Sequence, residues 1–143
     1  MKLLSTELYG TPIVKLRVVL PDTELEDKNK KPFRVIQGAA LKVIYEDTKG
    51  HRYSKTLVAE KNYCYDGASI PFKIGKGNMK LPIPALFHDI MCENKQKIDR
   101  DRNLSSQIFK DLLIHCGVNK VIAQIMYLAV DNYQRFMKGW KDE

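Results

Sequence analysis

The pattern of apolar residues changes period once along this chain, and that change constrains the fold more than any other feature. Up to about residue 65, apolar side chains form short β-branched runs or alternate with polar ones, which is typical of strands. Beyond residue 84 they recur every three or four positions, which is typical of helices. Strands followed by helices predict an α+β fold, in which an N-terminal antiparallel sheet within residues 12–65 is packed with three C-terminal helices within residues 84–140.

Five segments have strand character, and polar or turn-forming residues separate them. They are residues 13–20, 33–36, 40–45, 53–59 and 63–65. Segments 40–45 and 53–59 flank the sequence Glu-Asp-Thr-Lys-Gly at residues 46–50. This turn signature predicts a β-hairpin.

Two shorter helices are expected first in the C-terminal part. One covers residues 84–93 and begins at Pro84, whose missing N–H costs nothing in a first helical turn. The next carries Leu104 and Ile108 at helical spacing and precedes Gly117, a candidate C-cap.

The third expected helix is the longest and ends near Trp140. Its apolar stripe comprises Ile122, Ile125, Met126, Ala129, Tyr133, Phe136 and Met137. We expect this stripe to pack in the core, while Trp140 is a candidate to dock a partner.

The chain has 143 residues, of which 44% are hydrophobic and 29% charged, an ordinary globular mixture. We expect one domain, residues 1–143, that is large enough to bury a core without disulfides. Cys64, Cys92 and Cys116 are too widely spaced for a disulfide framework and fit a reducing compartment. No apolar run approaches the roughly 20 residues of a membrane span, and polar residues interrupt any export-signal core, so we expect a soluble chain.

The net charge is +7, from 24 Lys and Arg against 17 Asp and Glu, and it is spread evenly along the chain. No basic tail or stripe indicates a specific nucleic-acid reader. Two local clusters lie in expected loops and comprise Lys28, Lys30 and Lys31, and Lys73, Lys76 and Lys80. They predict either a weak, salt-sensitive contact with nucleic acid or acidic proteins, or a surface that merely keeps the chain in solution.

One short constellation points to chemistry. Residues 66–71, Asp-Gly-Ala-Ser-Ile-Pro, join the sheet part to the helical part. Asp66 and Ser69 can bond nearby backbone N–H groups, so one interpretation is a tight turn that stops a strand. In the other, Asp66 orients His88 by a charge-assisted hydrogen bond, because the spacer of residues 72–82 is short enough to loop out and return.

His88 and Asp89 are adjacent in the first expected helix. Its apolar face comprises Leu86, Phe87, Ile90 and Met91. We therefore expect that His88 need not belong to the core. An imidazole beside a carboxylate can act as general base or metal ligand, and the alternative is a hydrogen-bonded structural histidine. If the chain is an enzyme, the expected catalytic residues are His88, Asp89, Asp66 and Ser69.

Together these motifs resemble the domain-of-unknown-function family 1353 over roughly residues 10–140. The resemblance rests on Asp-Gly-Ala-Ser-Ile-Pro at 66–71, His88-Asp89 after a proline-containing spacer, then Arg102 and Phe109, and a last amphipathic helix. Members are commonly encoded by bacteriophages and prophages, so the resemblance implies a phage protein and no established activity.

In the family pattern an Asp stands three residues before the Phe of the second helix, where this chain has Ser106. Asp99 or Asp101 can replace that carboxylate only if their loop folds back. The layout of His88-Asp89 on one helix, beside an antiparallel helix that carries Phe109, is also loosely similar to that of secreted phospholipases A2. In those enzymes the His is a base and the adjacent Asp binds calcium. The glycine-rich calcium loop and the disulfides of those enzymes are absent from this sequence.

The cysteines and histidines match no closed zinc framework, because no Cys-x2-Cys pair exists. We expect no cofactor, and the sequence assigns no metal. Two functions remain open. The first is a binding or structural component of a virion or phage protein complex, made in the host cytoplasm, with other phage proteins as partners. The second is a small hydrolase with a His-Asp site, either phospholipase-like or metal-assisted. Ser106 removes one expected acid and so favours the first.

Overall fold

The computed structural model describes residues 1–16, 33–65, 82–93 and 102–136. Within them, six strands precede three helices, which confirms the α+β class. The strands are β1 (Lys2–Tyr9), β2 (Ile13–Leu16), β3 (Phe33–Gln37), β4 (Ala39–Glu46), β5 (Arg52–Ala59) and β6 (Cys64–Tyr65). The helices are α1 (Pro82–Glu93), α2 (Arg102–His115) and α3 (Lys120–Phe136).

The strands form two antiparallel sheets instead of the single sheet expected. The long sheet has the order β1-β4-β5, and the short sheet has the order β2-β3-β6. The β4–β5 hairpin pairs Ala39 with Ala59 and Glu46 with Arg52, which confirms the predicted hairpin. Between β3 and β4, Gly38 lies so close to β5 that a Cβ there would stand 2.5 Å from the carbonyl oxygen of Ala59. Any larger residue would force apart the strands where the chain passes between sheets.

Strand β1 is the main element that the sequence pattern did not predict. It pairs with β4 from Lys2 opposite Glu46 to Tyr9 opposite Ala40, with an irregularity between Leu3 and Ser5. Its side chains are mostly exposed or half-buried, so its apolar signal is weak. The predicted sheet of residues 12–65 therefore begins too late along the chain.

The long sheet buries one face. Leu41, Val43 and Tyr45 alternate along β4 and are buried, together with Leu57 and Ala59 of β5. The residues between them point away from the core, as period-two alternation requires.

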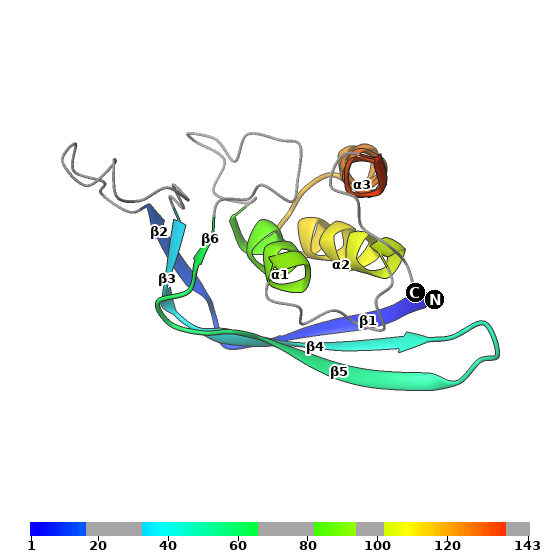
Figure 1. The fold of residues 1–143 in the computed structure, drawn as a ribbon, viewed down its shortest axis with the longest axis horizontal. Helices are drawn as coiled ribbons and strands as arrows, with labels where there is room; N and C mark the ends of the chain where they lie inside the picture. Colours follow the sequence, from blue (N-terminus) through cyan, green and yellow to red (C-terminus); the bar gives the residue numbers. More distant parts are fainter. Residues whose placement is uncertain (17–32, 66–81, 94–101, 137–143) are drawn as a thin grey trace.

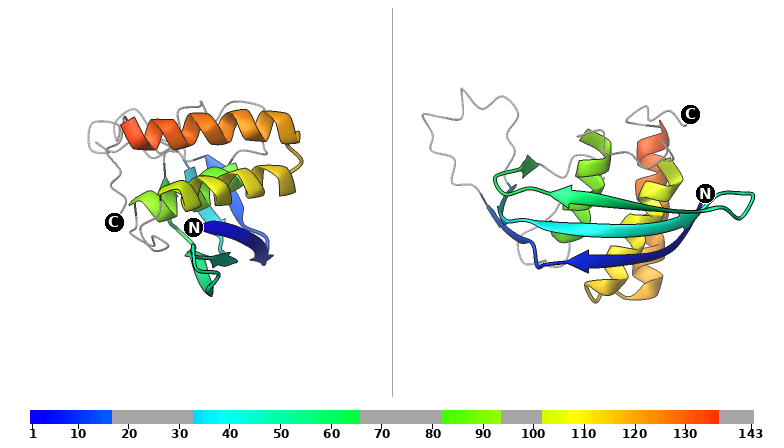
Figure 2. Two further views of the ribbon diagram at one scale, coloured as in Figure 1. Left: turned by 90° about the vertical axis from the view of Figure 1, so that its right-hand side faces the viewer. Right: turned by 90° about the horizontal axis from the view of Figure 1, so that it is seen from below.

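The helices lie on this buried face in two layers (Figure 1). Helix α1 contacts β5, α2 contacts β1, and the two helices contact each other. Helix α3 packs on α2, on the side away from the long sheet (Figure 2). Helix α3 is thus the outer layer of the helical part, with one flank on α2.

Helix α1 is the most buried element. Every residue from Pro84 to Met91 is buried, which is typical of a helix enclosed by its neighbours on all sides. Its main apolar contributions to the core are Ala85, Leu86, Phe87, Ile90 and Met91.

The turn between α2 and α3 is set by two residues. Gly117 has a φ of 92°. Its N–H donates to the carbonyl of Ile114, and the N–H of Val118 donates to the carbonyl of Leu113. This is a Schellman C-cap, and it confirms Gly117 as the end of the second helix. Asn119 then caps α3, because its Oδ1 accepts a hydrogen bond of 2.8 Å from the N–H of Val121.

Candidate functional site

His88 and Asp89 lie in the middle of α1, and both have an exposed fraction of 0%. The His88 ring packs against Phe109 of α2, with 5.5 Å between ring centroids. The Nε2 atom of His88 makes no hydrogen bond within the described part of the chain. The expectation that His88 need not belong to the core is therefore wrong. It failed because α1 is enclosed on all sides and has no solvent face at this position.

Burial governs the protonation of this region. It lowers the pKa of His88 to about 3, so the imidazole is neutral at pH 7. Burial also raises the pKa of the Tyr65 hydroxyl above its ordinary value, and the nearby charges of Asp89 and Tyr63 add to that shift. The rings of Phe33, Tyr65 and Tyr63 stack in sequence across the short sheet. His88 and Asp89 are thus part of a closed, aromatic-rich interior.

Several predicted site residues lie outside the described residues. These are Asp66 and Ser69, Asp99 and Asp101, and both lysine clusters. The predicted hydrogen bond between Asp66 and His88 therefore stays a prediction, and so does the contact through the basic loops.

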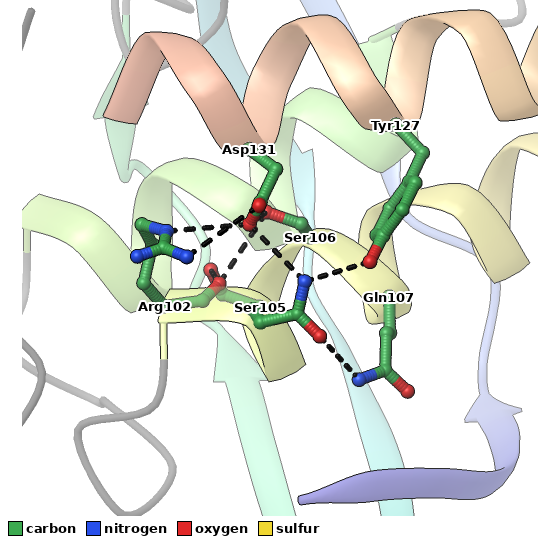
Figure 3. Close-up of polar contacts among 7 residues, drawn as sticks. Arg102, Ser105, Ser106, Gln107, Tyr127 and Asp131 are labelled. Atoms are coloured by element: carbon green, nitrogen blue, oxygen red, sulfur yellow. Dashed lines mark hydrogen bonds and ion pairs between the residues drawn. The ribbon is translucent and has the colours of Figure 1, made fainter. Parts of the chain in front are cut away.

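A polar cluster joins the start of α2 to α3 (Figure 3). At its centre, the Asp131 carboxylate on α3 accepts hydrogen bonds from Arg102 Nε at 3.3 Å and Nη2 at 3.5 Å. Asn103 Nδ2 donates to the same carboxylate at 3.3 Å, and Ser106 Oγ donates at 3.0 Å. The arginine and the aspartate are largely buried, so this ion pair is partly screened from water. We call these four residues the Asp131 cluster.

The cluster continues to the N-terminal strand. Asn103 Nδ2 also donates to the Tyr127 hydroxyl, and Asn103 Oδ1 accepts from Gln107 Nε2 at 2.8 Å. The Gln107 amide then bonds the backbone at the start of the chain. Its Oε1 accepts from Leu3 N of β1 at 2.9 Å, and its Nε2 donates at 3.1 Å to Met1 O, one residue before β1. Hydrogen bonds thus run without a break from β1 through α2 to α3.

Asp131 brings a carboxylate within 3.0 Å of the hydroxyl of Ser106, the residue at which the family resemblance led us to expect an Asp. Ser106 occupies the place of that Asp on α2, and its hydroxyl bonds a carboxylate supplied by α3 instead. Sequence reasoning did not identify Asp131. Its signal was a set of polar residues, Tyr127, Asp131 and Gln134, at helical spacing on the same face as Ala123 and Val130.

The outer face of α3 corrects a second expectation. Four large aliphatic residues on it are exposed: Val121 by 68%, Ile122 by 53%, Ile125 by 60% and Leu128 by 50%. We call these four residues the α3 stripe. Ile122 and Ile125 were expected in the core, but the face that packs on α2 carries Ala123, Val130 and the Asp131 cluster instead. Because the partly polar face of α3 packs on α2, the aliphatic face points to solvent.

A groove of about 470 Å³ lies beside α3. It is lined by Leu3, Gln107, Lys110, Asp111, Ile114, Gln124 and Tyr127. Lys110 bonds the Gln124 side chain across it and lies 5.6 Å from the centre of the Tyr127 ring. Asp111 accepts from the Thr6 hydroxyl and lies 3.6 Å from His115 Nε2. The groove therefore holds one cation close to α3 and one carboxylate directed toward β1 and the end of α2.

Two further properties bear on function. Among the residues that the structure describes, no group of three His, Cys, Asp or Glu side chains could hold a metal ion. No helix in the same residues is long and apolar enough to cross a membrane.

The model of one protein family matches residues 40–130, which is more than half of the chain. That family is described as a protein of unknown function, DUF1353, and this chain belongs to it. The match runs from β4 through α1 and α2 to Val130 of α3, and so ends one residue before Asp131. No curated protein and no solved structure matches the chain.

Proposed function

We propose that this chain is a protein-binding component of a phage-encoded complex or virion, and that it binds its partner through the α3 stripe. The observation that carries the proposal is the exposure of four aliphatic side chains, each by half or more, on one face of one helix. Exposed apolar residues scattered singly are ordinary on protein surfaces, whereas a contiguous group on one helix is typical of an interaction surface.

The place of α3 in the fold supports the same conclusion. Helix α3 is the outer layer of the helical part and packs on α2 through its other face. The Asp131 cluster fixes that inner face, because a largely buried charge pair with two further donors has a defined geometry. The outward direction of the α3 stripe therefore follows from the polar contacts beneath it.

The phage setting rests on the family resemblance drawn from residues 66–71 and from His88-Asp89. A phage-encoded component would be made in the host cytoplasm and carried into the particle with other phage proteins.

The alternative is a small hydrolase using His88. A hydrolase needs a base that water and substrate can reach, and one whose pKa lies near the working pH. His88 and Asp89 have an exposed fraction of 0%, and burial holds the pKa of His88 near 3. Both observations support a structural role for this pair in the folded chain.

The proposal is tested by the substitution Ile125→Glu in the phage that encodes the chain. Ile125 is exposed by 60%, so a glutamate there can remain in water, and the chain should fold normally. We expect virions purified by density gradient to lose the variant chain by at least about tenfold, as immunoblotting measures, because burying that charge costs more than about 1.4 kcal/mol.

The matched control is Thr56→Glu on β5, an exposed position on the long sheet. It adds the same charge to another face and should leave incorporation unchanged. If both variants are incorporated like the natural chain, or the natural chain is absent from virions, the proposal is wrong. A hydrolytic activity of the purified chain that His88→Gln abolishes would favour the alternative.

A further inference from the structure

The α3 stripe has the spacing that helices use to pack against other helices. Val121, Ile125 and Leu128 are separated by four and then three residues, which is the spacing of a coiled-coil seam. Ile122 widens this seam on one side. Exposed side chains at this spacing present ridges that fit between the side chains of a second helix.

The groove lies beside the α3 stripe, on the side opposite Ile122, and enlarges the surface open to a partner. Gln124 lines the groove and is three residues after Val121 and four before Leu128, so it neighbours both on the helix surface. A helix seated on the stripe would therefore have one flank above the groove. Lys110 lies there, held by Gln124 and by the face of the Tyr127 ring.

Two lysines flank the stripe, one at the start of α3 and one at the edge of the groove. Lys120 is exposed at the start of α3, and Lys110 lies at the groove edge next to Gln124. Within the described part of α3, the acidic residue is Asp131, which is engaged by Arg102, Asn103 and Ser106 on the opposite face. Asp111 in the groove is directed to Thr6 and His115. The chain as a whole carries +7.

These charges disfavour a second copy of the chain as the occupant. Two copies would bring +7 against +7, and like charges facing each other weaken association. The stripe from Val121 to Leu128 is also only about 10 Å long at a rise of 1.5 Å per residue. Four aliphatic side chains on so short a stretch of helix expose less area than the roughly 800 Å² that each partner of a stable dimer buries.

From this spacing and charge we infer that the partner presents an amphipathic helix, with an aliphatic seam that packs on the α3 stripe and with acidic flanks that face Lys110 and Lys120. The inference rests on the proposed function, because it names the kind of element that the partner offers. An apolar helix laid along a groove is a common mode of peptide recognition, and the basic flanks select the charge of the ligand.

The test uses three synthetic helical peptides of three heptads. All have the same length. The first has leucine at the seam and glutamate at the flanks, the second has lysine in place of glutamate, and the third has glutamine in place of leucine. Binding to the purified full chain is measured by fluorescence anisotropy at 150 mM salt, and sedimentation reports the oligomeric state of the chain. We expect the first peptide to bind at least about tenfold more tightly than either of the others.

Two variants connect that binding to the surface. Ile125→Glu should weaken the first peptide at least about tenfold, and the pair Lys110→Gln with Lys120→Gln should weaken it about threefold and reduce its dependence on salt. Thr56→Glu should change neither value, and circular dichroism checks that each variant is folded.

Three results would overturn the inference. Equal binding of the first two peptides would show that charge does not select the partner. Binding of none of them, with a monomeric chain, would exclude an acidic helix as the ligand. Self-association that Ile125→Glu abolishes would assign the stripe to a second copy. In the last two cases the virion experiment can still support the proposed function, so the two failures are distinguishable.

Discussion

Ser106 Oγ on α2 donates a hydrogen bond to Asp131 Oδ1 on α3, across 3.0 Å. This contact, with the Arg102 fork on the same carboxylate, holds the outer helix against the middle one. It also decides which face of α3 is buried, and so it places the aliphatic residues of the α3 stripe outside.

The first prediction concerns a carboxylate at position 106. Ser106→Asp would place a second acid beside Asp131 in a fully buried position, and we expect a loss of about 2–3 kcal/mol in the free energy of unfolding. Ser106→Ala removes the hydroxyl that faces both Asp131 Oδ1 and the Arg102 carbonyl, and adds no charge, so it should cost only about 1 kcal/mol. Urea denaturation measures both losses.

The double variant Ser106→Asp with Asp131→Ser is the control for this mechanism. It moves the carboxylate from α3 to α2 and leaves one acid among the four residues of the Asp131 cluster. It should be more stable than Ser106→Asp alone, with a coupling of about 1 kcal/mol or more in a double-mutant cycle. Additive losses would mean that the two side chains do not interact.

The second prediction concerns Gln107, whose side-chain amide bonds the backbone of Leu3 in β1 and of Met1 just before it. Gln107→Ala should release the backbone N–H of Leu3. The Leu3 amide should then exchange with solvent about fivefold faster, because one hydrogen bond contributes about 1 kcal/mol of net stability. Hydrogen exchange at the amide of Val43, in the central strand β4, is the internal reference.

Gln107→Glu separates the hydrogen bond that this amide accepts from the two that it donates. A carboxylate still accepts from Leu3 N but cannot donate to Met1 O or to Asn103 Oδ1. It should keep most of the protection at Leu3 while lowering the stability of the whole chain. Faster exchange at Leu3 in both variants would contradict the bonding that we describe.

The third prediction is a dependence of stability on pH that comes from His88. Its pKa is about 3 in the folded chain and about 6.5 in an unfolded one, so only the unfolded chain takes up this proton between those values. The contribution is fully present above pH 6.5 and is lost as the pH falls toward 3, by up to about 1.4 kcal/mol per pH unit.

His88→Gln isolates this effect from the neighbouring Asp89 and Tyr65, which are present in both proteins. The difference in unfolding free energy between the natural chain and the variant should be constant above pH 7 and should shrink between pH 6 and pH 4. A difference that does not change with pH would show that His88 is not buried in its neutral form.

The sequence was a good guide to structure wherever the signal is local. The β4–β5 hairpin carries its alternation and its turn residues within twenty-one residues, Ala39–Ala59, and the end of α2 is marked by Gly117. Strand β1 was missed because it is held by pairing with β4, some forty residues later, and by the Gln107 amide. Neither partner can be found in the pattern of Lys2–Tyr9 itself.

The orientation of α3 shows a second limit. Counting apolar residues placed Ile122 and Ile125 in the core, because a helix normally buries its most apolar face. Here the buried face is partly polar, and it is stable because Arg102, Asn103 and Ser106 satisfy Asp131. A network between two helices depends on their packing, which periodicity does not specify. The same holds for His88, whose burial depends on how α1 is enclosed.

The most direct test of the binding role is a photo-crosslinking amino acid placed at Ile125 in the chain as it assembles in infected cells, with the same group at Thr56 as the control. Mass spectrometry identifies the products. We predict that position 125 forms a crosslink to one phage protein, in a peptide with aliphatic residues at helical spacing, and that position 56 does not. Crosslinks from neither position, or the same products from both, would contradict a partner seated on the outer face of α3.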